Sequence, residues 1–245
     1  MTHTLKALIF DVDGTLADTE LEGHLHAFNA AFADADLDWH WDVPLYIELL
    51  RVTGGMERIT HYARTYHPRL IERSGFSELV ARVHANKTEY FLHRVEKGLM
   101  GFRPGVARLL SEAHQAGLTL AIATTTSPQN VERLLAVNMP PELKQKPNHG
   151  FAVIAAGNMV AAKKPAPDIY HYALDRLALQ AADCLAIEDS EPGLAAALGA
   201  GLPTLITVNS ITRNHNFSGA MRILEDLGST SLADLQNWHA QAVSN

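Results

Sequence analysis

The pattern of hydrophobic and polar residues changes along the chain. From about Arg103 onward, short and nearly continuous apolar runs alternate with segments of helical spacing. We interpret as strands the runs ALIF (7–10) near the N-terminus, TLAIA (119–123), FAVIA (151–155), CLAIE (184–188) and PTLITV (203–208), with helices at 168–179 and 192–201. Strands of this kind that alternate with helices are typical of a parallel sheet covered on both faces. The sequence therefore predicts an α/β fold.

A long helical stretch follows the first predicted strand. From about Thr19 to Gly101 apolar residues such as Leu25 and Phe28 recur at helical spacing, and no strand-like run is evident. Thr15 and Thr124 are 109 positions apart. A simple strand–helix–strand unit needs only about 30 residues, so this stretch is much longer than a simple connection between the first two predicted strands.

Composition and charge restrict the class of protein. The 245-residue chain is 47% hydrophobic and 19% charged, which is an ordinary globular balance. Its net charge of −7 argues against a nucleic-acid-binding surface. The single cysteine, Cys184, lies in an apolar run and is expected to be a small buried hydrophobic residue. Neither a signal segment nor an apolar run of about 18 residues is evident, so we expect a cytoplasmic protein without membrane association.

Acidic or polar residues follow three of the predicted strands. Asp11 and Asp13 follow the first and Thr124 the second, while Glu188 ends the run at 184–188 and Asp189 follows it. The carboxyl ends of parallel strands form one edge of the sheet, where ligands bind. A helix-capping role would explain Asp189 alone but not the whole set. Carboxylates gathered at one edge repel each other unless a cation lies among them, and a few hard oxygen ligands suit Mg²⁺. The sequence predicts a magnesium site.

Four motifs are similar to those of a known family. DVDGT (11–15), Thr124, KPAPD (164–168) and EDS (188–190) resemble, in this order, the motifs of the haloacid dehalogenase-like hydrolases. The resemblance implies a Rossmann-like parallel-sheet core built from residues 1–17 and 103–245, with an α-helical cap at 18–102 inserted between the first two motifs. The dehalogenases of this family lack the second aspartate, so Asp13 favours phosphoryl transfer.

The carboxylate pair has a chemical explanation in this family. Asp11 is expected to attack phosphorus and form an aspartyl-phosphate. Asp13, two positions on in an extended segment, would lie on the same side and act as general acid and base. Thr124 would hold the phosphoryl group and Lys164 would neutralise its charge. The resemblance also implies a Mg²⁺ ion bound by Asp11, the main-chain carbonyl of Asp13, Glu188 and Asp189.

A second anion site is predicted in the cap. In RVTGGMERI (51–59), Gly54 and Gly55 precede a predicted helix whose first turn carries Arg58. A helix N-terminus together with an arginine can bind an anion such as a second phosphate. The alternative is an ordinary glycine-rich turn with a surface arginine.

The match to one branch of the family extends over nearly the whole chain. DTE (18–20), GHLHAFN (23–29), WHWDVPLYIELL (39–50), TGGMERI (53–59), ATTTSPQNVE (123–132) and AAGNMVAAKKPAPDIY (155–170) resemble the CbbY-type sugar-phosphate phosphatases. This resemblance implies hydrolysis of xylulose-1,5-bisphosphate, an inhibitor of Rubisco in the Calvin cycle, to xylulose 5-phosphate. The residues that it implies for substrate binding are Glu20, His24, Tyr46, Gly54, Gly55, Arg58, Thr125, Thr126 and Asn130. Met56 departs from the branch, which usually has lysine there.

Several alternatives stay open at the level of sequence. A sugar phosphomutase of the β-phosphoglucomutase kind shares the core, the cap and both aspartates, and the motifs do not distinguish it from a phosphatase. A phosphate-sensing protein without turnover is disfavoured by the complete catalytic set. His24 and Tyr46 could equally serve cap packing or lie on the helix surface, and Trp39 and Trp41 are expected in the cap core rather than in a substrate platform. The expected partner is a small sugar phosphate, with no nucleic acid or membrane, and the protein is expected to be a monomer.

Overall fold

The structure, a computed structural model, describes residues 3–244. The chain divides into two compact units, Met1–Asp18 with Gly101–Asn245, and Thr19–Met100. We call the first unit the core and the second the cap. The divisions at 18/19 and 100/101 compare with 17/18 and 102/103 expected from the sequence.

The core is built on a six-stranded sheet in which all neighbouring strands are parallel, as predicted. The strands are β1 (Ala7–Phe10), β2 (Thr119–Thr124), β3 (Val153–Ala156), β4 (Cys184–Glu188), β5 (Thr204–Thr207) and β6 (Arg222–Leu224), in the spatial order β3-β2-β1-β4-β5-β6. The sequence predicted five of these strands. It missed β6, a three-residue edge strand with two exposed side chains, because so short a segment has no apolar run to reveal it.

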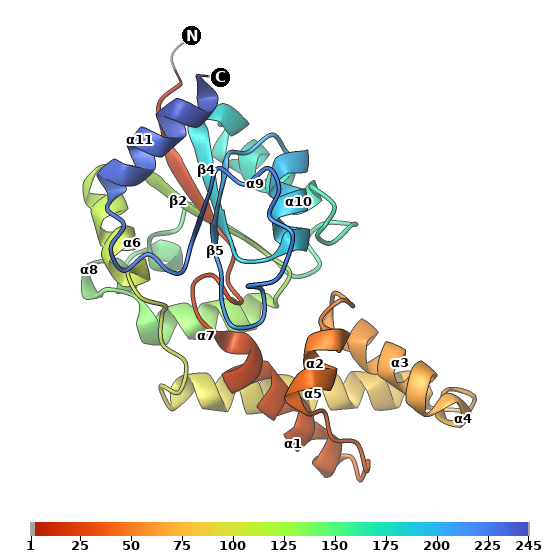
Figure 1. Cartoon of the computed structure of the whole chain (residues 1–245). Helices are drawn as coiled ribbons and strands as arrows, with labels where there is room; N and C mark the ends of the chain where they lie inside the picture. Colours follow the sequence, from red (N-terminus) through yellow and green to blue (C-terminus); the bar gives the residue numbers. More distant parts are fainter. Residues whose placement is uncertain (1–2, 245) are drawn as a thin grey trace. The chain divides into compact units, whose positions relative to one another are not determined.

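Helices cover both faces of this sheet. The helices of the core are α6 (Val106–Gln115), α7 (Pro128–Asn138), α8 (Pro141–Lys144), α9 (Asp168–Leu177), α10 (Glu191–Gly199) and α11 (Leu232–Val243). Figure 1 shows α9 and α10 on one side of the strands and α6 and α11 on the other. On the first side Ile9, Ala123 and Ala186 pack against Tyr170 of α9 and Ala196 of α10. Small strand residues allow the helices to lie close to the sheet, which gives the Rossmann-like core implied by the family resemblance, with the sheet covered on both faces.

The strand register aligns the carboxyl ends of the central strands. Phe10, the last residue of β1, is opposite Ile122 of β2 and Ile187 of β4. The residues that follow these positions therefore meet at one edge of the sheet, as the sequence predicted. Cys184, at the opposite end of β4, is fully buried in the core, as expected for a small hydrophobic residue.

All the regular secondary structure described in the cap is helical. A π-helical turn (Glu20–Leu25) leads into α1 (His26–Asp34), α2 (Val43–Leu49), α3 (Gly55–Tyr66), α4 (Pro68–Ile71) and α5 (Phe76–Glu96). Its core contains an aromatic cluster in which Phe28 and Phe32 pack on Trp41, and Trp39 packs on Phe32 and Tyr62. The expectation that both tryptophans belong to the cap core is confirmed.

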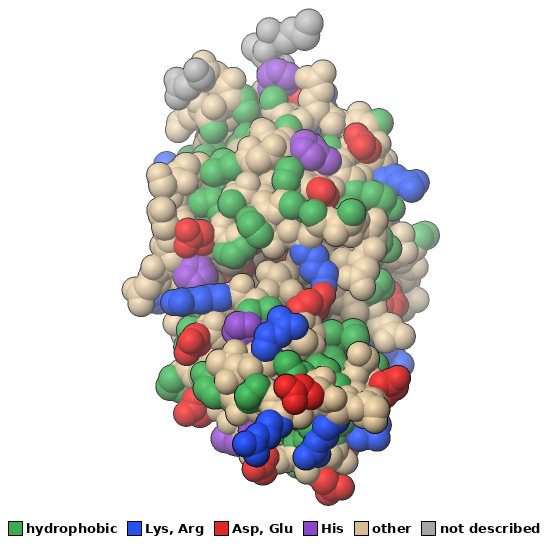
Figure 2. All heavy atoms as spheres, turned by 90° about the vertical axis from the view of Figure 1, so that its right-hand side faces the viewer, with side chains coloured by type: hydrophobic (Ala, Val, Ile, Leu, Met, Phe, Trp, Pro, Cys, Tyr) green, Lys and Arg blue, Asp and Glu red, His purple; other side chains and the backbone are tan. Residues whose placement is uncertain are grey.

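The described residues contain no helix that is both long and apolar enough to span a membrane. On the face shown in Figure 2, Lys and Arg side chains stand among Asp and Glu side chains rather than in one continuous patch.

Candidate active site

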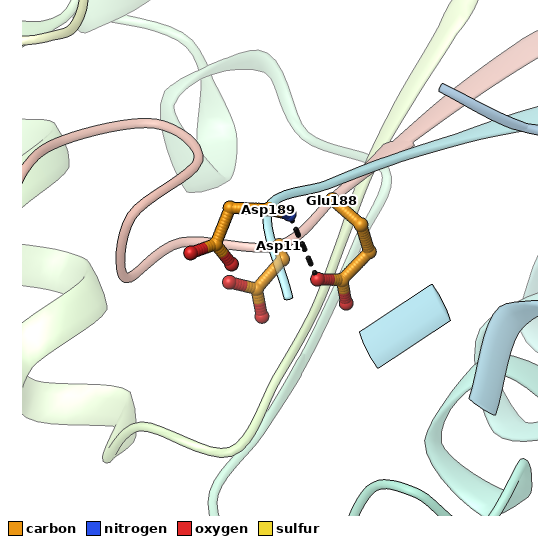
Figure 3. Close-up of side chains that lie close together, drawn as sticks. All are labelled: Asp11, Glu188 and Asp189. Atoms are coloured by element: carbon orange, nitrogen blue, oxygen red, sulfur yellow. Dashed lines mark hydrogen bonds between the residues drawn. The ribbon is translucent and has the colours of Figure 1, made fainter. Parts of the chain in front are cut away.

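Three buried carboxylates meet at the carboxyl edge of the sheet. Asp11 follows β1, Glu188 ends β4 and Asp189 follows it, and one oxygen of each lies within 4.8 Å of the others. Figure 3 shows the three side chains converging from two neighbouring strands. Their exposed fractions are 7%, 0% and 5%. Three acids buried together are unfavourable unless positive charge lies close by.

Lys164 supplies part of that charge. Its Nζ donates hydrogen bonds to Oδ1 of Asp11 at 2.6 Å, to Oε1 of Glu188 at 2.6 Å and to the carbonyl of Ala123 at 2.8 Å. An ammonium group has three N–H donors, so these bonds engage all of them and fix the group in space. One lysine against three carboxylates leaves two negative charges uncompensated in a buried pocket.

The pKa values of these groups also reflect the excess of negative charge in the pocket. Burial raises the pKa of Asp11 to about 7, against the lowering effect of Lys164. Burial and the neighbouring Glu188 raise the pKa of Asp189 well above its usual range. Although burial by itself lowers the pKa of Lys164, attraction to Asp11 and Glu188 outweighs it and holds that pKa above its usual value.

The donor set and the charge of the pocket fit a divalent cation. Carboxylate oxygens are hard ligands that Mg²⁺ and similar ions prefer, and a charge of +2 equals the uncompensated charge of the pocket. A cation among the carboxylates would keep Asp11 and Asp189 ionised at neutral pH despite their burial.

Glu188 has partners that the sequence did not reveal. Its Oε1 accepts a second hydrogen bond from the hydroxyl of Tyr170 at 2.7 Å, and its Oε2 accepts from the main-chain N–H of Asp189 at 3.2 Å. A Cβ atom on Gly193, in the first turn of α10, would overlap this carboxylate. Glu188 therefore holds Lys164 and Tyr170 in place as well as facing the other acids. Tyr170 follows the KPAPD motif by two residues, which is the signal that could have identified it.

The loop after β1 makes a tight turn that only glycine allows easily. Gly14 has φ of +84°, and its N–H donates to the carbonyl of Ala17 at 2.8 Å. A Cβ atom at Gly14 would overlap the side chains of Asp189 and Asn209. Asp13, directly before it, is half-buried and its carboxylate lies outside the group of three. Its roles as acid–base group and as carbonyl ligand stay predictions.

Arg103 fixes this loop and was not predicted as a site residue. Its guanidinium donates to the carbonyls of Gly14 at 2.5 Å, Thr207 at 2.9 Å and Val208 at 2.6 Å, as well as that of Glu225 at 2.9 Å. The side chain is 8% exposed. A charged residue between the predicted cap and the first helix of the core carries no sequence signal that distinguishes it from a surface arginine.

The end of β2 carries the predicted phosphoryl-binding residues. The hydroxyl of Thr124 accepts from the N–H of Thr126 at 3.3 Å, and Nδ2 of Asn130 donates to the hydroxyl of Thr126 at 3.2 Å. Ser127 caps the N-terminus of α7 by accepting from the N–H of Asn130 at 3.3 Å. Thr125, which lies between Thr124 and Thr126 in the sequence, is half-buried. The structure thus brings these residues together at the N-terminus of a helix.

The cap residues form two polar clusters inside the cap. Tyr46 donates to Glu20, and Nη1 of Arg58 donates to the hydroxyl of Tyr46 at 3.3 Å. Arg58 also donates from Nε to the carbonyl of Leu49 at 3.2 Å. Arg58 is only 8% exposed, so the surface-arginine alternative is wrong. Tyr46 is fully buried, so packing rather than the helix surface is its local environment.

The second cluster joins His24 to Lys87, which the sequence analysis did not single out. Nζ of Lys87 lies 2.8 Å from Nδ1 of His24, and His24 stacks on Phe91 with ring centroids 4.2 Å apart. Both polar side chains are buried. A lysine in the middle of a long amphipathic helix gives no sign in the sequence that it faces inward.

The glycine pair begins α3 as expected. Gly54 has φ of +101° and precedes Gly55, the first residue of the helix. Met56, where the related branch usually has lysine, is 43% exposed.

Comparison with known proteins agrees with the fold and the site. The family model of the haloacid dehalogenase-like hydrolases matches residues 5–201. With its parallel-sheet core, its helical insertion and its buried Asp11–Lys164–Asp189 site, the chain belongs to the haloacid dehalogenase-like hydrolases. It is an enzyme of the phosphatase type within this family.

The most informative relatives are the CbbY proteins. The chain is 50% identical to the plasmid protein CbbY of Cupriavidus necator, over 91% of this chain and 86% of that protein. It is 44% identical to CbbY of Cereibacter sphaeroides, over 94% and 97% of the two chains.

Solved crystal structures of a CbbY protein are also similar to this chain. The crystal structure of CbbY from Rhodobacter sphaeroides in complex with phosphate superimposes with a TM-score of 0.82 at 43% identity, covering 94% of this chain and 99% of that one. A mutant of the same protein, crystallised with xylulose-(1,5)bisphosphate, gives 0.83 at 42% identity, covering 95% and 99%.

Proposed function

We propose that this protein is a Mg²⁺-dependent phosphatase that converts a small sugar bisphosphate, xylulose-1,5-bisphosphate, to xylulose 5-phosphate through an aspartyl-phosphate. The observation that carries the proposal is the buried group of Asp11, Glu188 and Asp189 with Lys164 bound to two of its members. Support for the substrate comes from the relative, 42% identical, whose crystal structure contains xylulose-(1,5)bisphosphate.

The chemistry proceeds in two displacements at phosphorus. A carboxylate oxygen of Asp11 forms a bond to phosphorus as the bond to the sugar oxygen breaks, and Asp13 gives its proton to that oxygen. Water then attacks the phosphorus of the aspartyl-phosphate, Asp13 takes the proton from the water, and inorganic phosphate leaves as the Asp11 carboxylate is restored. Atoms and charge balance without any further reactant.

The surrounding residues stabilise the charge of the transferring group. Lys164 is held by its three hydrogen bonds with its charge beside Asp11, where negative charge develops. Mg²⁺ bound by Asp11, Asp189, Glu188 and the carbonyl of Asp13 would neutralise the phosphoryl oxygens. The hydroxyl of Thr124 and the N-terminal turn of α7, with Thr125, Thr126 and Asn130, are proposed to bind the phosphoryl group.

The cap residues are proposed to recognise the rest of the substrate. Arg58 has five N–H donors and uses two of them within the cap, so the others remain for a second phosphate, together with the N–H groups of Gly54 and Gly55. Glu20 and His24 are proposed to contact sugar hydroxyls, whereas Tyr46, also expected to do so, is fully buried and is proposed instead to hold Glu20 in place. Met56 supplies no charge here, so Arg58 bears more of the anion binding than in relatives with lysine.

A phosphatase is preferred to the phosphomutase alternative. The β-phosphoglucomutase of Clostridium difficile superimposes with a TM-score of 0.77 but is 19% identical, a likeness that concerns the fold alone. The CbbY relatives are similar in sequence over nearly the whole chain.

The test is to incubate the protein with Mg²⁺ and a panel of sugar phosphates, and to measure inorganic phosphate and the remaining sugar. We expect stoichiometric phosphate release, with kcat/KM for xylulose-1,5-bisphosphate at least about tenfold above that for monophosphates. Isomerisation of a sugar monophosphate with little phosphate release would favour the mutase instead. Equal kcat/KM values over the panel would contradict the assigned substrate while leaving the phosphatase intact.

The role of Arg58 is tested on two substrates of the same variant. Arg58→Ala should raise KM for the bisphosphate much more than KM for a small phosphate ester, because only the bisphosphate has a second phosphate to lose. Because both KM values are measured on the same variant, any effect of the substitution on folding applies equally to the two substrates. Arg64→Ala, on an exposed position of the same helix, is the control and should change neither value. Equal increases for both substrates would assign Arg58 a structural role.

A further inference from the structure

A fourth strand also places a polar side chain at the carboxyl edge of the sheet. Asn209 follows β5 by two residues, and its Nδ2 donates to Oδ2 of Asp189 at 2.8 Å. The same amide nitrogen lies 3.5 Å from the carbonyl oxygen of Gly14. Asn209 thus links the segment after β5 with Asp189 and with the loop that contains Asp11 and Asp13.

The orientation of this amide is fixed by its own loop. Its Oδ1 accepts hydrogen bonds from the N–H groups of Ile211 at 2.9 Å and Thr212 at 3.0 Å. The N–H of Asn209 donates to the hydroxyl of Thr212 at 3.2 Å, and Thr212 is buried. Because both bonds to Oδ1 require an acceptor, the NH₂ group must face Asp189. Asn209 is therefore a hydrogen-bond donor to the carboxylate and not a ligand for a cation.

This bond restrains a carboxylate that would otherwise turn away from its neighbours. Asp189 is 5% exposed and shares its pocket with Asp11 and Glu188, which repel it. Asn209 engages Oδ2 of Asp189 and leaves Oδ1 for a cation. The close approach depends on Gly14, since a Cβ atom there would overlap both Asp189 and Asn209.

We propose that Asn209 is a positioning residue that orients Asp189 for Mg²⁺ binding without touching the ion or the substrate. The inference rests on the proposed Mg²⁺ site. Residues that hold a metal ligand by a hydrogen bond typically contribute about 10- to 100-fold to metal affinity, so loss of the Asn209 amide should weaken Mg²⁺ binding by a factor in this range.

The experiment measures Mg²⁺ binding directly, by calorimetric titration of the protein without substrate. Asn209→Ala removes both the amide and the turn that it stabilises. Asn209→Ser keeps a hydroxyl that can accept from the N–H of Thr212 but is too short to reach Asp189. Asn214→Ala, at an exposed position of the same loop, is the matched control. Melting curves in EDTA report the stability of each variant apart from the metal.

We expect both Asn209 variants to bind Mg²⁺ about 10- to 100-fold more weakly, to lose most of the rise in Tm that Mg²⁺ produces, and to regain most of kcat at saturating Mg²⁺. The serine variant should melt in EDTA close to the wild type. Unchanged Mg²⁺ affinity in both variants would overturn the inference, as would loss of kcat that saturating Mg²⁺ does not restore. If the wild-type protein itself binds no Mg²⁺, the proposed function fails, and that result is distinct from the first two.

Discussion

Nζ of Lys164 lies 2.6 Å from Oδ1 of Asp11, although 153 positions separate the two residues along the chain. The same ammonium group reaches Oε1 of Glu188, so one cation joins the first, third and fourth motifs of the family. Both side chains of the Lys164–Asp11 pair are almost fully buried. Removal of one partner of such a pair leaves a buried charge without compensation.

Lys164→Met should abolish measurable turnover and destabilise the protein. We expect kcat/KM to fall by at least about 10³-fold, because the group proposed to neutralise charge near phosphorus is lost. The free energy of unfolding in EDTA should fall by about 3 kcal/mol, since three carboxylates then lack their cation. Phosphate release and denaturant unfolding measure the two effects. Lys146→Met, at an exposed site, should change neither quantity, and near-normal activity of the Lys164 variant would contradict the assigned role.

Tyr170→Phe tests the hydrogen bond to Glu188 with the ring retained. The loss of a bond from a buried hydroxyl to a charged group should lower the free energy of unfolding by about 2 kcal/mol. Activity should fall less than in the Lys164 variant, because Glu188 keeps its bond to Lys164. Tyr172→Phe, on the same helix, is the control. A Tyr170 variant as stable as the wild type would show that Glu188 does not need this donor.

Arg103→Met should destabilise the loop that contains the two aspartates proposed to be catalytic, Asp11 and Asp13. The side chain bonds four main-chain carbonyls, and their loss should lower the free energy of unfolding by about 3 kcal/mol. Because the carbonyl of Gly14 loses its shortest hydrogen bond, we expect kcat to fall even at temperatures where the variant is folded. Circular dichroism and phosphate release under the same conditions measure this. Arg82→Met, exposed on α5, is the control, and full activity of the folded Arg103 variant would contradict the prediction.

Removal of the metal should make stability depend on pH in a defined direction. In metal-free protein the pKa of Asp11 is about 7, above the value of 3.8 for an ordinary aspartate, so the folded state binds this proton more tightly than the unfolded state. The contribution of this bound proton to the free energy of unfolding is fully present below pH 4 and is lost as the pH rises through 7. We therefore expect a lower Tm in EDTA at pH 8 than at pH 6.

Two further measurements complete that test. Mg²⁺ should reduce or reverse the difference in Tm, because a bound cation favours the ionised carboxylates. Asp11→Asn should lose much of the pH effect and all turnover while it remains folded. A Tm in EDTA that rises from pH 6 to pH 8 would contradict the expected sign.

Much of the core could be predicted because its signals are local. Residues 7–10 form an apolar run that ends at Asp11, and residues 184–188 form another that ends beside Asp189. Because the carboxyl ends of parallel strands form one edge of the sheet, the rule that ligands bind at this edge predicts that both acids lie close together there. The same rule applied to residues 203–208 would have found Asn209, the first polar residue after that run. It was missed because one asparagine after a strand is common.

Other features had no local signal. Arg58 looks like a surface arginine on a helix, and only the packing of α2 against it shows that it is buried and bonded to Tyr46 and the carbonyl of Leu49. Lys87 is similar, since its inward direction depends on how α5 packs on its neighbours within the cap. The edge strand β6 depends on β5 for its pairing.

The sequence by itself determined the α/β core, the helical insertion and the acids at the sheet edge, because strand length, helical spacing and short motifs are set by neighbouring residues. Only the tertiary structure decided which groups form hydrogen bonds with one another. Lys164 donates to both Asp11 and Glu188. Arg103 donates to the carbonyl of Gly14, and Asn209 donates to Asp189. Hydrogen bonds and charge pairs depend on distances of about 3 Å. Such distances between residues far apart in the chain are fixed only when the strands and helices have packed.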